Sequence, residues 1–164
     1  MSTRRGMSFA GADIDAFRHR VIVARDSVEF AATPRVALRA LVADAPASPE
    51  AASALLDLAR LAAAAADDAA ARAALDQLDR HPDAAALAMP ARYLRCTMEQ
   101  TDPGRRACLA GFRAAFPGSP RDAEVLARLA VVTARDGDCR AALPLLAEYR
   151  RRYPGGPSAA DVRA

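Results

Sequence analysis

The sequence predicts an all-α fold, an α-solenoid of about four helix-turn-helix hairpins. Three observations indicate it: abundant alanine, proline-containing breaks at even spacing, and an apolar stripe that recurs between the breaks. The first prolines of the four breaks lie at positions 46, 82, 117 and 154, which gives spacings of 36, 35 and 37 residues. A fixed period in this range is typical of helical repeat arrays.

Alanine accounts for 44 of the 164 residues, and it is the residue that most favours a helix. Leu, Ile, Val and Phe together number 32, just under a fifth of the chain. That fraction would suggest disorder in a highly charged chain, but the net charge here is only +3. We therefore expect one folded, helix-rich unit with a lightly packed interior.

The N-terminal part is expected to supply an irregular first hairpin. Residues 1–11 are predicted to be a disordered leader, and residues 12–157 the helical repeat domain. A first helix is predicted over residues 12–30, where the β-branched run at 21–23 fits the helical stripe. Pro34 is tolerated in the first turn of the next helix, which should end before Pro46. The stripe of the first helix consists of Ile14, Phe17, Val21 and Val28.

The three following units repeat one pattern of two helices. The twelfth residue after each first proline is a leucine, and the ninth and fifteenth complete an apolar stripe. Polar turns at residues 67–68, 101–104 and 136–138 end the first helices. The second helices carry Leu75 and Leu78, then Leu109, Phe112 and Phe116, then Leu146, Tyr149 and Tyr153. Residues 158–164 are predicted to begin a further, incomplete helix.

The three cysteines, Cys96, Cys108 and Cys139, are too few and too widely spaced for a C-x₂-C zinc site. One interpretation is that they are small buried helix residues. The other is a disulfide between Cys96 and Cys108, which flank the turn at 101–104 at similar distances. Two antiparallel helices would then bring them face to face, and the compartment would be oxidising.

The cellular location is also open to two interpretations. No apolar run approaches the ~18 residues of a membrane span, and residues 1–9 have no apolar region of a signal peptide. These observations predict a cytoplasmic protein. A periplasmic location would follow if an export segment has been removed, or if Cys96 and Cys108 are bonded.

The last unit resembles the tetratricopeptide repeat in its longer-period bacterial variety, as found in Tol-Pal-associated and barrel-assembly-machine proteins. The resemblance rests on the run from Gly137 to Leu143, followed by Leu146, Tyr149 and Tyr153-Pro154. It extends over about residues 34–157. The unit ending at Pro82 departs from the pattern by one residue, and the next unit has Arg105 where the family has a small alanine.

This resemblance implies a superhelix whose concave surface, lined by the first helix of each hairpin, binds an extended peptide or a partner helix. An arginine-bearing groove would hold a carboxylate bidentately, and Tyr93 would anchor the partner. The alternative is that these residues are solvated polar faces of ordinary helices. The family's groove positions select Asp57, Arg60, Arg92, Tyr93, Glu99, Gln100, Glu124, Arg128 and Arg135.

The sequence does not predict catalysis, a cofactor or a metal. His19 lies between two arginines, and His81 occupies the aromatic position before Pro82, where a packing role is expected. Neither histidine has a serine or cysteine at a recognisable motif spacing. The aspartate pairs at 67–68 and 136–138 fall at predicted turns, where aspartate caps helices.

The function we expect is therefore that of a non-catalytic protein-protein interaction scaffold. One alternative is a self-associating assembly subunit, because an array without a capping helix would leave Leu143 and Leu146 uncovered. Another is the regulatory segment of a membrane-anchored protein of the anti-sigma or FecR type. Nucleic-acid binding through Arg150, Arg151 and Arg152 is not favoured, because the 23 basic and 20 acidic side chains are interspersed.

Overall fold

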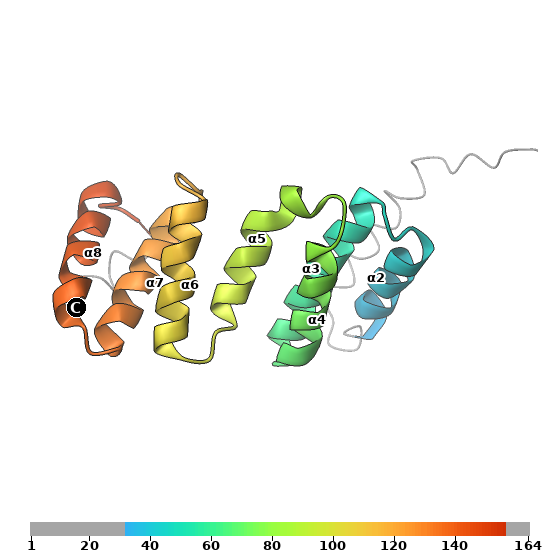
Figure 1. Ribbon diagram of the computed structural model, residues 1–164, viewed down its shortest axis with the longest axis horizontal. Helices are drawn as coiled ribbons and strands as arrows, with labels where there is room; N and C mark the ends of the chain where they lie inside the picture. Colours follow the sequence, from blue (N-terminus) through green and yellow to red (C-terminus); the bar gives the residue numbers. More distant parts are fainter. Residues whose placement is uncertain (1–31, 157–164) are drawn as a thin grey trace, which may run out of the picture.

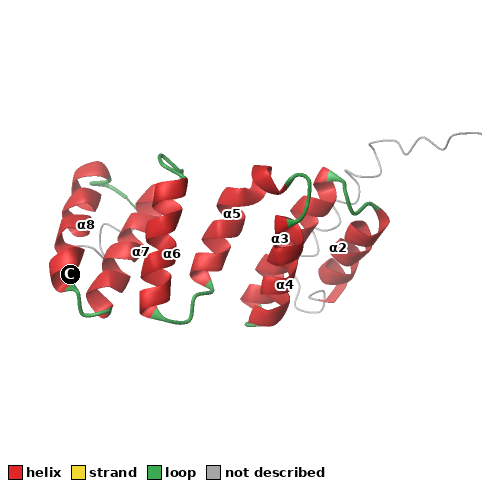
Figure 2. Ribbon diagram, in the orientation of Figure 1, coloured by secondary structure: helices red, strands yellow, loops and turns green. Residues whose placement is uncertain are grey.

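The computed structural model describes residues 32–156 as an all-α row of helices (Figures 1 and 2). This confirms the all-α part of the predicted fold class. The predicted leader at 1–11, the helix at 12–30 and the incomplete helix at 158–164 lie outside the described residues. The described helices are α2 (Ala32–Asp44), α3 (Pro49–Ala64), α4 (Asp68–Asp79), α5 (Ala84–Thr97), α6 (Asp102–Ala115), α7 (Asp122–Arg135) and α8 (Cys139–Arg152).

The helices pack in the order in which they occur in the chain. Each helix from α2 to α8 contacts the next, and α3 also contacts α5. Consecutive helices run in opposite directions because short turns join them, and α2 and α8 lie at opposite ends of the row (Figure 1). Residues close in sequence are therefore also close in space, as the proline spacing predicts.

Side-chain caps explain where several helices begin. The hydroxyl of Ser48 accepts a hydrogen bond from the Ala51 N–H, at 3.1 Å. The carboxylates of Asp67 and Asp138 accept from the N–H three residues later, both at 3.0 Å. Such caps satisfy donors that the first turn of a helix leaves free. They confirm the interpretation of these two aspartates as helix caps.

The core consists of three neighbouring clusters of side chains. Many of its members are alanines, which let helices approach closely where larger residues would not fit. The first cluster joins α3, α4 and α5 through Leu55, Leu56, Leu75, Leu78 and Ala91, together with Met98 directly after α5. The second joins α5, α6 and α7 through Tyr93, Cys96, Leu109, Phe112, Val125, Leu129 and Val132. The third joins α7 and α8 through Leu126, Ala127 and Tyr149.

A disulfide links α5 to α6. It joins Cys96 and Cys108, whose Cα atoms lie 5.3 Å apart, whereas Cys139 is free and exposed. Cys96 is fully buried and Cys108 is half-buried. Of the two interpretations of the cysteine pair, the structure has the disulfide, a bond typical of oxidising compartments.

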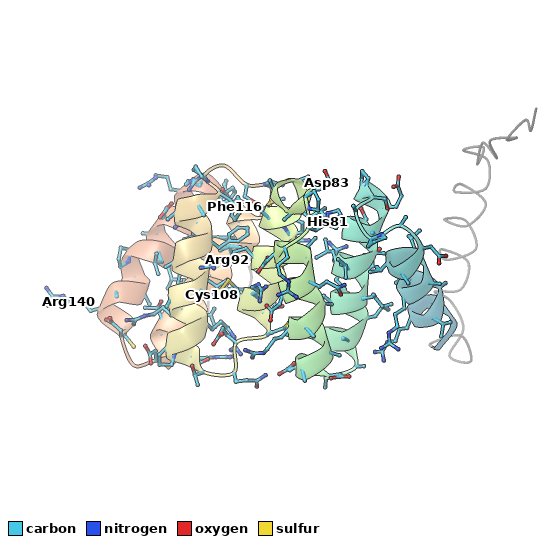
Figure 3. The ribbon with its side chains drawn as sticks, turned by 45° about the vertical axis from the view of Figure 1, so that its right-hand side comes forward. His81, Asp83, Arg92, Cys108, Phe116 and Arg140 are labelled. Carbon is cyan, nitrogen blue, oxygen red and sulfur yellow. A yellow bond between two sulfur atoms is a disulfide. The ribbon has the colours of Figure 1, made fainter. Side chains whose placement is uncertain are left out.

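His81 lies in the turn between α4 and α5, next to Asp83 (Figure 3). Its side chain is buried, and its Nδ1 accepts a hydrogen bond from the Asp83 N–H at 3.0 Å. The imidazole therefore packs in the aromatic position before Pro82, as expected. Among residues 32–156, no helix is both long enough and apolar enough to cross a bilayer.

Candidate binding surface

The side chains of Tyr93, Arg121, Glu124 and Arg128 meet between α5 and α7, and we call them the Tyr93 cluster. The Tyr93 hydroxyl donates to Glu124 Oε1 at 2.5 Å. Arg128 Nη2 lies 3.0 Å from the same oxygen, and Arg121 Nη1 lies 3.1 Å from Glu124 Oε2. One carboxylate thus orients a phenol and two guanidinium groups from two successive hairpins.

The two arginines of the cluster also cover the ring of Tyr93. The guanidinium carbon of Arg121 lies 4.5 Å from the ring centroid and that of Arg128 lies 5.9 Å from it. Such cation–π contacts are worth about 0.5–1 kcal/mol at exposed sites. The ring meets Phe112 edge to face, with centroids 5.9 Å apart. Tyr93 is consequently only 9% exposed.

These contacts change the acid–base properties of both hydrogen-bonded groups. Burial and the hydrogen bond to the Glu124 carboxylate raise the pKa of Tyr93 to about 12. Burial by itself would raise the pKa of Glu124, but the Tyr93 hydrogen bond and the charges of Arg128 and Arg121 outweigh it and lower that pKa. Glu124 is therefore a carboxylate, and Tyr93 a neutral donor, at ordinary pH.

Helical periodicity explains why α7 supplies most of this surface. Residues at intervals of three and four lie on one face of a helix, and buried residues make up most of the rest of α7, which packs on α6 and α8. The exposed or half-buried stripe consists of Arg121, Glu124, Arg128, Val131 and Arg135. Arg135 therefore continues the basic surface beyond the Tyr93 cluster.

The structure brings three of the predicted groove residues together: Tyr93, Glu124 and Arg128. Tyr93 differs from the expectation in one respect, because its ring is already covered by the chain's own arginines and Phe112. It orients the arginines rather than offering an open aromatic anchor. On α3, Asp57 and Arg60 form an exposed ion pair with each other at 3.0 Å.

Arg92, Glu99 and Gln100 lie away from the Tyr93 cluster. A Cβ atom placed on Gly111 would lie 3.4 Å from Arg92 Nη2, so Arg92 points toward α6 (Figure 3). Arg92 and Tyr93 are neighbours in sequence, and one residue is a rotation of about 100° on a helix. Glu99 lies over the first turn of α6, beside Gly104. The amide of Gln100 donates to Asp68 Oδ2 at 2.6 Å, at the start of α4.

Sequence reasoning missed Arg121 and a second charged network. Arg121 precedes α7, and only the three-residue spacing to Glu124 could have indicated it. The second network joins α6, α7 and α8 around Asp122, which is 5% exposed. Its other members are Arg113, Glu148, Arg152 and Tyr153.

The buried carboxylate of Asp122 has three donors. Arg113 Nε lies 2.9 Å from Oδ1, Arg152 Nη1 lies 2.9 Å from Oδ2, and the Tyr153 hydroxyl donates to Oδ2 at 2.7 Å. Arg113 Nη2 also lies 2.7 Å from Glu148 Oε1. This network fixes α8 against α6 and α7, so we assign it to stability. Within residues 32–156 no group of three or more His, Cys, Asp or Glu side chains is arranged to hold a metal ion.

We expect Tyr93 to be the tyrosine that deprotonates with a midpoint near pH 12. The chain has three tyrosines and no tryptophan, so the near-ultraviolet absorbance of tyrosinate reports on them cleanly. The titration of Tyr93→Phe, subtracted from that of the parent, should give this midpoint, and Glu124→Gln should lower it. A difference curve centred near pH 10, the ordinary tyrosine value, would contradict the geometry of the cluster.

Comparisons of the chain with protein-family models, with curated proteins and with solved structures found no match. The likeness to the tetratricopeptide family therefore rests on the residues quoted above and stays a prediction.

Proposed function

We propose that this chain is a non-catalytic protein-protein interaction module built as a tetratricopeptide-like superhelix. In this proposal the first helices of the hairpins, α3, α5 and α7, share a concave face that binds a peptide or a partner helix. The sequential packing of antiparallel helices supports the proposal. So do the fully buried alanines, such as Ala59 and Ala130, which allow close helix contacts.

The observation that carries this proposal is that the two arginines in the Tyr93 cluster are held in place and yet remain exposed. Glu124 and the Tyr93 ring hold both guanidinium groups in place. Even so, the side chains of Arg121 and Arg128 are 42% and 52% exposed. A guanidinium that is oriented before binding loses less side-chain entropy when it meets a carboxylate, and it offers a planar pair of donors.

The test compares two charge reversals of the same size. Arg128→Glu should reduce recovery of the binding partner about tenfold or more in affinity capture from the source cell, because it puts a like charge against an acidic ligand. Arg140→Glu is the matched control, since Arg140 is exposed on α8 and points away from the row (Figure 3). Circular dichroism should show both variants to be folded.

Equal recovery of the same proteins by the parent chain and both variants would contradict binding at the Tyr93 cluster. If only Arg140→Glu reduced recovery of the partner, binding at the Tyr93 cluster would also be contradicted, because the site would then lie on α8.

Self-association is the second candidate, and one observation favours it. Val36 on α2 and Leu143 on α8 are large apolar residues that remain exposed, at opposite ends of the row. A copy stacked end to end on another would cover both. Light scattering measures this directly, and a strictly monomeric mass at high protein concentration would contradict it.

A further inference from the structure

A cavity of about 200 Å³ lies between α2 and α4, and α3 forms its floor. It shares no residue with the Tyr93 cluster. Arg39 and Val42 line it from α2, Leu55 and Leu58 from α3, and Ala73 and Ala74 from α4. We call it the α2–α4 slot.

At the equivalent position near the other end of the row, an ion pair bridges the two helices. The prolines at 46 and 117 lie 71 residues apart. A shift of 71 residues also relates Leu38 of α2 to Leu109 of α6, and Leu78 of α4 to Tyr149 of α8, and all four residues are buried. These pairs therefore occupy equivalent positions in the repeat. Between α6 and α8, Arg113 and Glu148 approach to 2.7 Å and bridge the two helices.

The α2–α4 slot lacks this bridge because other residues occupy the two equivalent positions. Moving back 71 residues from Arg113 and Glu148 leads to Val42 and Gln77. Both line the slot, and neither carries a charge. The other facing side chains of α4 are alanines, which are too short to reach α2. The slot therefore has uncharged residues at the two positions that form an ion pair across the corresponding interface.

The rim of the slot has an excess of positive charge, because two arginines, Arg35 and Arg39, line it against one carboxylate, that of Asp67. Arg106, which corresponds to Arg35, lies 3.2 Å from Asp136 Oδ2. Arg35 instead donates to the Leu61 carbonyl at 2.8 Å. Arg39 is exposed and forms no ion pair with any residue of the described part of the chain. The carboxylate of Asp67, at the same slot, accepts from the Ala70 N–H as the cap of α4.

We propose that the α2–α4 slot is the docking site for a segment of a partner protein that carries a leucine-sized side chain beside a carboxylate. The apolar side chain would lie between the alanines of α4 and Val42, and the carboxylate would pair with Arg39. The volume suits one or two side chains, since pockets for whole small molecules usually measure about 300–1,000 Å³. Charge complementarity selects an acidic segment over a basic one.

The test uses a designed probe and a variant that restores the missing bridge. The probe is a fluorescent, end-capped peptide in which glutamate and leucine alternate with alanine. Fluorescence anisotropy measures its binding to the full chain. The double variant Val42→Arg, Gln77→Glu should weaken binding about tenfold or more, a change of about 1.4 kcal/mol. It should keep or raise the thermal midpoint, because it copies the Arg113–Glu148 pair.

Three controls make the outcome specific. A probe with glutamine for glutamate should bind more weakly, and Arg39→Gln should bind both probes equally. Arg140→Glu should bind the probe as the parent does, because Arg140 is exposed on α8 and belongs to neither the slot nor the Tyr93 cluster.

No binding of the probe at millimolar concentration would overturn the proposal, as would undiminished binding by the double variant. Arg39→Gln keeps the test decisive if the double variant does not fold. A dimer of the parent chain that the double variant abolishes would identify a second copy as the occupant, and it would also overturn the proposal.

Discussion

Replacing Asp122 with alanine should lower the free energy of unfolding by about 3–5 kcal/mol, the usual cost of breaking a buried ion pair. The substitution leaves Arg113, whose side chain is 19% exposed, without the carboxylate that lies 2.9 Å from its Nε. It also removes the acceptor of the Tyr153 hydroxyl. Urea denaturation followed by circular dichroism measures the change.

The matched control is Asp57→Ala. Asp57 also pairs with an arginine, Arg60 at 3.0 Å, but both side chains of that pair are exposed. Exposed pairs contribute about 0–1 kcal/mol, so this variant should unfold close to the parent. If the two alanine variants lose the same stability, the Asp122 network does not hold the C-terminal helices together.

The same network predicts how stability depends on pH. Burial would raise the pKa of Asp122, but hydrogen bonds from Arg113 and Tyr153 and the charges of Arg113 and Arg152 outweigh it and lower that pKa. A carboxyl with a lowered folded pKa stabilises the fold above its unfolded pKa of about 3.9. That contribution is lost as the pH falls through the lower folded value. Asp122→Asn should therefore show a shallower loss of stability below pH ~4 than the parent.

The fold could be predicted from the sequence because its signals are local. Prolines, capping side chains (Asp67, Thr101 and Asp138) and leucines at helical spacing each act within a few residues, and they recur with nearly the same period. Repetition also reveals where an interface differs. The repeat period alone shows that Val42 occupies the position equivalent to Arg113. The cavity beside Val42 is seen only once α2, α3 and α4 are packed together.

The candidate site could be predicted only in part because it depends on helix rotation. Tyr93 and Arg92 are adjacent, and the likeness to the repeat family selected both for one face. The structure separates them, because Arg92 points at Gly111 of α6 whereas Tyr93 meets Glu124 of α7. Contacts between hairpins join residues about 31 positions apart, as in Tyr93–Glu124 and Asp122–Tyr153. No local pattern in one sequence predicts such pairs.

Removing the disulfide should also lower the free energy of unfolding strongly, and it should change the titration of Tyr93 in the Tyr93 cluster. The double variant Cys96→Ala, Cys108→Ala should lose about 3 kcal/mol, the stabilisation expected of a crosslink that closes a loop of ~15 residues. The bridge spans 12 residues and joins the hairpin of α5 and α6. Alanine is chosen because serine would place a hydroxyl at the fully buried position of Cys96.

The effect should extend to Tyr93 because α5 has few other strong attachments. Toward α4 its polar contacts are Arg95 with Asp76 and Asp79, at 3.0 and 2.6 Å, and both carboxylates are exposed. Such pairs contribute little. Without the crosslink, α5 should move more freely against α6 and α7, and water should reach the Tyr93 hydroxyl. Its titration midpoint should then fall from about 12 toward the ordinary value near 10.

Reductant provides the internal check on both measurements. A dithiol that reduces the bond should shift urea denaturation and the tyrosine titration of the parent chain toward those of the double variant. It should leave the double variant itself unchanged. Cys139→Ala should behave as the parent in every condition, because that thiol is free and exposed. If the reduced parent keeps its stability but the double variant does not, lost packing at Cys96 rather than the crosslink explains the change. If the Tyr93 midpoint stays at about 12 in both, α7 and Phe112 hold α5 in place without the disulfide.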